Sequence, residues 1–296
     1  MATRYWTNGA GTGVVSTASN WTPSGAPSAG DILIFASSTT GASTTDNVVG
    51  GNYSALGLMA EIRIGQNFVK SFGSSSSYVR IEGTTVVLES GGDVYLDVES
   101  STSTAKVIVN HTPLSADAVH LRGDIHELRV LDSAGDVSIE ATTSSSTSSG
   151  NTEVDTIYVF NNMGGKVTTE TSVTSLDTVH MDNGTMESSC AATTVSVYGG
   201  TFTQQSTGAL TTLNVYGQDT FVYSSGSGTV TNLNVYDGRT VFQNNGSDGL
   251  TVTNCTLYGG IIDLQPSLRN ITFTNNIVAR AGTLLPPLAS TISVAY

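Results

Sequence analysis

The sequence predicts an all-β fold, a single-stranded parallel β-helix of roughly ten coils with an N-terminal cap. A short apolar phrase ending in Tyr recurs about every 20 residues, and self-similarity at such a period is typical of stacked-repeat folds. The four clearest copies begin at Val195, Leu213, Leu233 and Cys255. Charged residues make up only 12% of the chain, and short runs rich in Val, Thr and Tyr alternate apolar with polar positions. A β-sandwich or jelly-roll is the competing fold.

Residues 1–50 differ from the rest and are expected to form a capping segment. They contain both tryptophans, Trp6 and Trp21, ahead of the apolar strand 32–35. The open end of a stacked β fold exposes apolar side chains and unpaired backbone groups, and two large rings would cover them. The alternative interpretation of the two rings is a platform on which sugars stack.

This opening resembles the start of many bacterial and phage β-helical surface and virion proteins, over roughly the first 31 of 296 residues. The matching residues are Trp6, Asn20, Trp21, Pro27, Gly30 and Asp31. The resemblance implies a β-helical stack after the opening phrase. It also implies a homo-oligomer, specifically a homotrimer, because such virion proteins are often trimeric.

Residues 51–285 are expected to form the coils of the β-helix. Successive coils are anchored by an inward apolar residue, and the steps between anchors are 16, 18, 20, 22 and 22 residues. These anchors are Val179, Val195, Leu213, Leu233, Cys255 and Ile277, each followed two positions later by a second inward residue. Upstream, Leu128 and Ile157 fit the same frame, and the Ser/Thr-rich segment 142–150 between them is a loop inserted into one coil. With strands about 4.8 Å apart, the stack would be on the order of 50 Å long.

Residues 286–296 are expected to lie outside the stack. Pro286 and Pro287 end the ladder, because proline donates no backbone hydrogen bond to a sheet. The segment 291–296 is expected to form one last strand, which either caps the end or is exchanged with a neighbouring chain.

Charge excludes some partners. Eleven basic residues stand against 24 acidic ones, a net charge of −13 that disfavours nucleic acid and anionic membranes. No apolar run has the length of a membrane span, and the opening residues lack the apolar core of a secretory signal. We therefore expect a chain made without classical export.

No catalytic, cofactor-binding or metal-binding set is predicted, and no cofactor is expected. Cys255 occupies an anchor position, so it is expected to be a buried apolar residue, and Cys190 a free thiol in the stack. The four histidines, His111, His120, His126 and His180, lack metal-binding spacing and are expected at the surface.

One carboxylate pair is a candidate for chemistry. Asp97 and Glu99 project from the same side of one strand. Such a pair could act as general acid and base on a polysaccharide, or bind Ca²⁺. Solvated surface carboxylates are the favoured interpretation.

A column of tyrosines is the most regular feature outside the core. Tyr198, Tyr216, Tyr236 and Tyr258 should point outward beside the glycine turns. They are expected to stack in register, or alternatively to form a face that docks a subunit or a glycan. Asn214 and Asn234 are outward as well and could form a short amide ladder.

Together these features favour a non-enzymatic structural virion protein of a bacteriophage: a capsid decoration, a fibre or a spike component. Its expected location is the virion, and its expected partners are further copies of itself, other virion proteins such as the major capsid protein, and a host surface glycan. Two alternatives stay open. One is a glycan-binding or glycan-cleaving tailspike or polysaccharide lyase, and the other is a secreted adhesin passenger on the bacterial surface.

Overall fold

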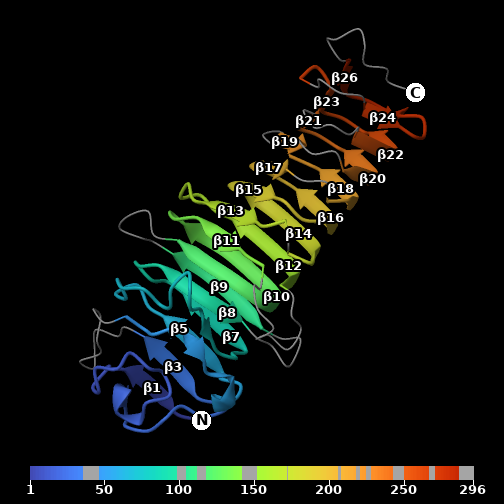
Figure 1. Ribbon diagram of the computed structural model, residues 1–296. Coiled ribbons are helices and arrows are strands. Elements are labelled where there is room, and N and C mark those ends of the chain that lie inside the picture. The colour runs from blue at the N-terminus through green and yellow to red at the C-terminus, as the bar shows by residue number, and fades with distance from the viewer. Residues whose placement is uncertain are drawn as a thin grey trace. The chain divides into compact units, whose positions relative to one another are not determined.

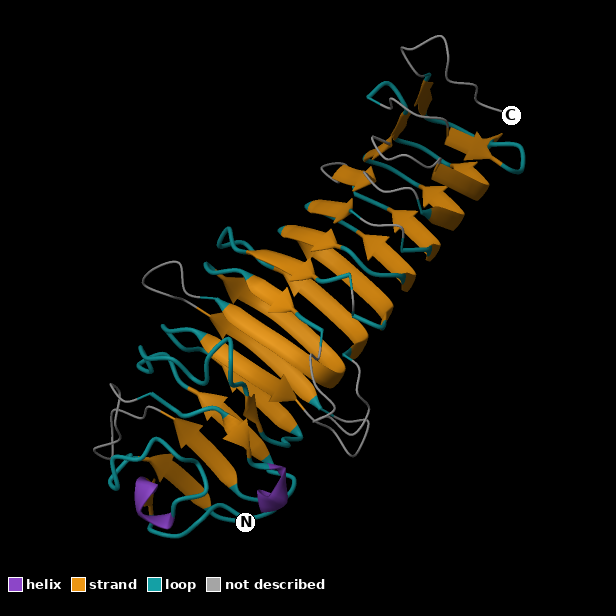
Figure 2. Ribbon diagram, viewed as in Figure 1, coloured by secondary structure: helices purple, strands orange, loops and turns teal. Residues whose placement is uncertain are grey.

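The computed structural model describes residues 1–35, 47–98, 105–111, 118–141, 152–171, 173–205, 208–217, 221–224, 228–242, 250–266 and 271–286. The described chain is all-β. It contains no α-helix and two short 3-10 helices, η1 (Ala18–Asn20) and η2 (Ser54–Leu56) (Figure 2). This agrees with a composition rich in β-branched residues and poor in helix formers.

The chain divides into two compact units, which are described separately. Unit 1 comprises residues 1–154 and 162–165, and unit 2 comprises residues 155–161 and 166–296. In both units the strands lie in two parallel sheets, here called sheet A and sheet B. Over most of the chain, successive strands alternate between the two sheets and a strand pairs with the next-but-one strand (Figure 1). The exceptions are the first and last strands and β10.

In unit 1, sheet A contains β1 (Thr3–Trp6), β2 (Trp21–Thr22), β3 (Ile32–Phe35), β5 (Glu61–Ile64), β7 (Thr85–Leu88) and β9 (Lys106–His111). Sheet B contains β4 (Gly51–Asn52), β6 (Val79–Arg80), β8 (Val94–Val98) and β11 (Val137–Ile139). The long strand β10 (Val119–Ser133) belongs to both sheets, because its first part pairs with β8 and its last part with β9. Only β2 pairs antiparallel to its neighbour among these named strands.

In unit 2, sheet A contains β14 (Ser175–Asn183), β16 (Ala192–Val197), β18 (Leu210–Val215), β20 (Thr229–Val235), β22 (Leu250–Leu257), β24 (Ile271–Phe273) and β25 (Val278–Ala279). Strand β12 (Glu153–Phe160), which belongs to unit 2 from Asp155 on, pairs with β14. Sheet B contains β13 (Lys166–Thr169), β15 (Thr185–Ser188), β17 (Thr201–Gln204), β19 (Phe221–Ser224), β21 (Arg239–Phe242), β23 (Ile261–Asp263) and β26 (Thr283–Leu285).

The register confirms the predicted apolar ladder in unit 2. Five anchors are paired strand to strand and buried: Val179, Val195, Leu213, Leu233 and Cys255. The second column of the ladder is paired as well: Met181, Val197, Val215, Val235 and Leu257. At the last step the register is kept, because Ala279 pairs with Leu257, but the predicted inward position is wrong: Ala279 is exposed and the anchor Ile277 is only half-buried. The anchor spacing read from the sequence therefore gives the strand register.

Unit 1 contains the same ladder further upstream than the sequence frame traced it. Its two columns are Leu33, Ile62, Val86, Val107 and Leu128, and Phe35, Ile64, Leu88, Val109 and Val130. All ten side chains are fully buried. The apolar side chains of each strand are covered by those of the two neighbouring strands. One strand alone could not bury this apolar surface.

Glycines after the tyrosines make the turn from sheet A to sheet B. Gly200 and Gly260 have φ values of 79° and 70°, a region that side-chain-bearing residues rarely adopt. A Cβ on Gly200 would also lie 2.4 Å from the carbonyl oxygen of Gly184 in the preceding turn. The second residue after the tyrosine is therefore a corner that favours glycine, and Gly238 occupies it in the third phrase with a φ of 77°.

Parallel pairing is contrary to the competing expectation of a sandwich or jelly-roll, whose strands pair antiparallel. The last described strand, β26, ends at Leu285, just before the two prolines. The predicted terminal strand 291–296 and the inserted loop 142–150 lie outside the described residues.

Candidate functional site

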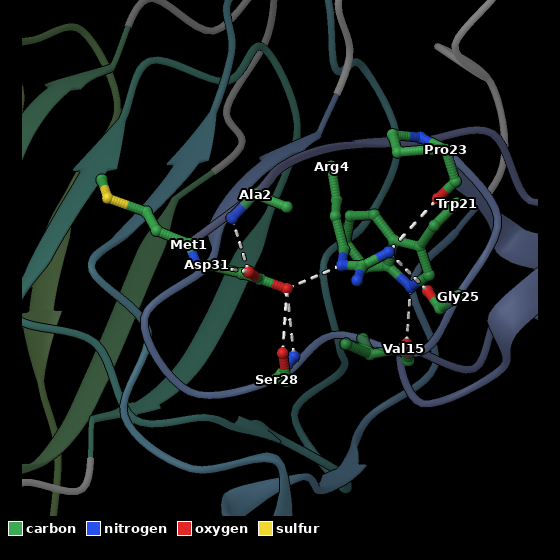
Figure 3. A network of polar contacts seen from close by, with 9 residues as sticks. All are labelled: Met1, Ala2, Arg4, Val15, Trp21, Pro23, Gly25, Ser28 and Asp31. Atoms are coloured by element: carbon green, nitrogen blue, oxygen red, sulfur yellow. Dashed lines mark hydrogen bonds and ion pairs between the residues drawn. The ribbon is translucent and has the colours of Figure 1, made fainter.

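Asp31, the last residue of the opening phrase, is a buried carboxylate at the centre of a network of polar contacts in the N-terminal segment (Figure 3). Its Oδ1 accepts a hydrogen bond from the backbone N–H of Ala2 at 2.7 Å, and its Oδ2 accepts one from Nε of Arg4 at 2.7 Å. The N–H and hydroxyl of Ser28 both donate to Oδ2 at 3.2 Å. Burial alone would raise the pKa of Asp31, but the hydrogen bonds from Arg4, Ala2 and Ser28 outweigh it and lower the pKa to about 2.

The two tryptophans are buried, so the sugar-platform interpretation is wrong. Trp6 and Trp21 are 0% and 2% exposed, and their ring centroids lie 5.2 Å apart at 73°. Phe35 packs against both rings, and Nε1 of Trp21 donates to the carbonyl of Val15 at 2.7 Å. The three rings therefore form a buried aromatic cluster at the first strands, and no ring face is left for a ligand.

Asn20 of the same phrase organises the loop that precedes it. Its side chain is fully buried and accepts a hydrogen bond from the N–H of Ala10 at 2.9 Å. Its Nδ2 donates to Thr12 Oγ1 and to the carbonyl of Val14. Asn20 therefore has a structural role. Its side-chain amide bonds to groups of a loop that has no regular backbone pairing.

The outer face of sheet B in unit 1 carries a cluster of ionisable and aromatic side chains. We call it the polar cluster; it consists of Tyr78, Arg80, Tyr95, Asp97, His120, Arg122 and Glu140. The strand register aligns these residues in two columns, one mainly aromatic and one of alternating charge. The sequence frame missed this cluster because its members are spread over more than 60 residues and belong to four different strands or their ends.

Glu140 is the centre of the polar cluster. Its Oε1 lies 2.5 Å from Nδ1 of His120, and its Oε2 accepts a hydrogen bond from the hydroxyl of Tyr78. Burial would raise the pKa of Glu140, but hydrogen bonds from His120 and Tyr78 outweigh it, and the pKa is lowered. Burial and the bond to the carboxylate raise the pKa of Tyr78. His120, with Nδ1 held by a carboxylate and a side chain 23% exposed, has the geometry of an oriented base.

Asp97 lies in the same cluster, and its predicted solvent exposure is wrong. Its side chain is 1% exposed and its Oδ2 accepts a hydrogen bond from Nε of Arg122 at 3.2 Å. The guanidinium of Arg122 lies 3.7 Å above the ring of Tyr78, which closes the cluster over Asp97. Its proposed companion Glu99 lies outside the described residues. Of the candidate acid–base pair, only Asp97 is described, and it forms an Asp–Arg pair beside the His120–Glu140 pair.

The histidines divide into three outward residues and one buried one. His120 and His180 lie between inward apolar neighbours, as predicted, and stack on Tyr95 and Tyr158 at 4.4 Å and 5.0 Å. His126 is exposed. The surface prediction for His111 is wrong, because the ring is fully buried and Nε2 lies 3.1 Å from the carbonyl of Gly92.

The outer face of sheet A in unit 2 carries the predicted tyrosine column. Neighbouring rings among Tyr198, Tyr216, Tyr236 and Tyr258 are stacked, with centroids 4.7, 4.6 and 4.6 Å apart and planes within 10°. Three of the rings are 38–44% exposed. Burial, followed by its two tyrosine neighbours, raises the pKa of Tyr216. Because each ring covers the face of the next, the column offers solvent its ring edges and hydroxyls.

Two amide ladders lie beside the tyrosines. In the predicted ladder, Nδ2 of Asn234 donates to Oδ1 of Asn214 at 3.0 Å. A second ladder was not predicted: Asn275 donates to Asn254 at 2.6 Å and Asn254 donates to Asn232 at 2.8 Å. The signal was present in the sequence, because these three residues recur at steps of 22 and 21 residues, close to the two 22-residue steps of the neighbouring anchors.

Both cysteines are buried free thiols. Cys255 pairs with Leu233 in the apolar ladder, which confirms its predicted place, and burial raises its pKa to about 12. Cys190 is in hydrogen-bonding distance of Thr169 and Ser188, and burial raises its pKa. Neither thiol has the lowered pKa and exposure of a nucleophile.

Comparison with known proteins gives no match to a family model, to a curated protein or to a solved structure. Over the part of the chain that the structure describes, no helix has the length and apolar character needed to cross a membrane. In the same residues, no three side chains of His, Cys, Asp or Glu are placed to hold a metal ion.

Proposed function

We propose that both units are runs of coils of a single-stranded parallel β-helix, and that the chain is a non-enzymatic structural protein of a bacteriophage virion. One coil would consist of one strand of sheet A and one of sheet B, with residues 1–50 as its cap. The alternation of strands between the two sheets, together with pairing to the next-but-one strand, supports this architecture.

The observation that carries the structural role is the repetition of outward residues as well as inward ones. Tyrosines stack on tyrosines and asparagines bond to asparagines on the face that a solenoid would leave to solvent. Such columns strengthen the attachment of each coil to the next. On this face the outward side chains contact one another along the stack. This arrangement suits a mechanical role, such as that of a capsid decoration, a fibre or a spike component.

The virion role has a direct experiment. Antibody raised against the recombinant chain should label purified phage particles in electron micrographs, and mass spectrometry of the same particles should recover its peptides. Co-sedimentation with shells of the major capsid protein would separate a decoration from a tail component. Absence of the chain from purified particles, in a lysate that contains it, would overturn the proposal.

A carbohydrate-active protein is the second candidate, and one specific observation favours it. In the polar cluster, His120 is oriented by Glu140 and lies near the buried Asp97–Arg122 pair. An oriented histidine of this kind can transfer protons to or from a glycan. Turnover of acidic or neutral polysaccharides by the purified chain, abolished in His120→Gln, would establish this function. A bacterial cell-surface location would accompany it.

A further inference from the structure

The outer face of sheet A in unit 2 is uncharged along its middle, although the chain carries a net charge of −13. Three columns of side chains lie along this face, here called the column face. The residues are Thr194, Thr212, Asn232 and Asn254; Ser196, Asn214, Asn234 and Thr256; and Tyr198, Tyr216, Tyr236 and Tyr258. Tyr, Asn and Ser are enriched in antibody binding loops, where aromatic rings supply rigid contact area and amides and hydroxyls supply adaptable hydrogen bonds.

The column face retains unused hydrogen-bonding groups. Among the described residues, none of the four tyrosine hydroxyls has a hydrogen-bond partner. Each hydroxyl can donate and accept, and the four follow one another at the spacing of the stacked rings, 4.6–4.7 Å. A partner that matches the whole row must repeat at the same spacing, and a second copy of this chain does so by construction.

The two ends of the tyrosine column carry opposite charges. Asp182 follows Met181, the partner of Val197, and therefore precedes Tyr198 in the column. Arg280 follows Ala279, the partner of Leu257, and therefore comes after Tyr258. Both side chains are exposed, and neither has an ion-pair or hydrogen-bond partner in the described residues. Five strand spacings, about 24 Å, separate them, well beyond the screening length of about 8 Å at physiological salt.

We propose that the column face binds the column face of a second copy of the chain, with the two stacks antiparallel. A two-fold axis along the strand direction, between Tyr216 and Tyr236, keeps each column opposite its own kind and reverses the stacking order. Tyr198 then faces Tyr258 of the second copy, and Asp182 faces Arg280 at both ends. In the middle column, Asn214 faces Asn234, so donors and acceptors of the two copies complement each other.

The size of the face sets the strength of the pair. The face is six strands long, at about 4.8 Å per strand, and three columns wide, with neighbouring columns two residues apart. Its area is therefore about 400 Å² per copy. The total of about 800 Å² is below the 1,200–2,000 Å² of stable complexes, so the pair is weak, with a Kd in the micromolar range or above. A parallel pair or a parallel trimer, as the resemblance implies, would instead place like charges together at each end.

Charge exchange tests the antiparallel pair. Sedimentation equilibrium of the full chain at 0.05 M salt, from roughly 5 to 500 µM, should show a dimer. Asp182→Arg and Arg280→Asp should each weaken it about tenfold, because each single variant creates two like-charge contacts. The double variant should restore the wild-type Kd, and no intramolecular pairing explains such a rescue over about 24 Å.

The controls make the outcome decisive. Asp177→Arg reverses a charge on the same strand, about 16 Å from Asp182 and beside the uncharged column that begins at Thr194, so it should leave the Kd nearly unchanged. Circular dichroism of every variant should match the wild type, which separates lost association from lost folding. A monomer at all concentrations, single variants that bind like the wild type, or a double variant as weak as the singles would each overturn the proposal. The test does not depend on the virion role.

Discussion

Replacement of Asp31 should loosen the N-terminal strands without unfolding the rest of the chain. The lowered pKa, about 2 against an ordinary 3.8, means that the ionised carboxylate is favoured in the folded state by about 2 kcal/mol. Asp31→Asn should lose at least that much at pH 7, because an amide cannot accept from Arg4, Ala2 and Ser28 together.

Tryptophan fluorescence can follow the unfolding of the N-terminal segment separately from the rest of the chain. The only two tryptophans, Trp6 and Trp21, lie in the segment that Asp31 holds, so their fluorescence reports this segment, while circular dichroism reports the whole sheet structure. In stacked repeats the ends open at lower free energy than the middle. In urea at pH 7, the fluorescence midpoint of Asp31→Asn should therefore fall clearly, and the circular dichroism midpoint should fall less.

The pH dependence has a definite sign. Because the folded-state pKa is lowered, the stabilisation is complete above the unfolded pKa and is lost as the pH falls from about 5 toward 2. The gap between wild type and Asp31→Asn should close over this window. As a control, Glu61→Gln removes a carboxylate from a surface pair with Arg63 and should change the midpoint little. Equal acid sensitivity of wild type and Asp31→Asn would refute the reasoning.

Three further predictions follow from the packing. Cys255→Ser should destabilise unit 2 by about 1–3 kcal/mol in urea melts, because a hydroxyl enters the apolar ladder, whereas Cys255→Val should be tolerated; both native thiols should resist Ellman's reagent at pH 8 until the chain unfolds. Tyr216→Ala loses two ring stacks and Tyr258→Ala only one, so the former should cost about 1 kcal/mol more, and equal costs would contradict the stacking account. Glu140→Gln should reduce the loss of stability between pH 5 and 3, because the lowered pKa of Glu140 makes its ionised form stabilising above its usual pKa; an unchanged acid profile would count against the His120–Glu140 pair.

The apolar ladder of unit 2 could be predicted from sequence because each strand shows its inward residues at alternate positions. Once Val195, Leu213 and Leu233 are aligned, the register follows, since a shift by one residue would turn every apolar side chain outward. The tyrosine column and the first amide ladder follow from the same alignment. The strands of sheet B in unit 2 were not predicted, although Val167, Met186 and Phe202 repeat with similar spacing, because these strands have only three or four residues.

The polar cluster could not be predicted because alternation gives the face of a side chain but not its exposure. Asp97 does point outward from β8, yet the side chain of Arg122 from the neighbouring β10 covers it. Likewise, His111 is the last residue of β9, where the pattern of inward anchors no longer constrains it. Such burial depends on which strands are neighbours in the sheet. Asp97 and Arg122 are 25 residues apart in the sequence, so a local pattern does not show that they are in contact.

The polar cluster and the column face differ in how far their polar groups already have hydrogen-bond partners. In the polar cluster, Glu140 already binds His120 and Tyr78, and Asp97 already binds Arg122, so a ligand would have to displace bonds that are partly shielded from water. On the column face, the tyrosine hydroxyls and the terminal charges lack partners in the described residues, so a second surface can bind there without breaking a bond. Displacement costs free energy that a new contact must first offset. By this measure, the proposed association through the column face of unit 2 costs less free energy of displacement than the binding of a ligand at the polar cluster of unit 1.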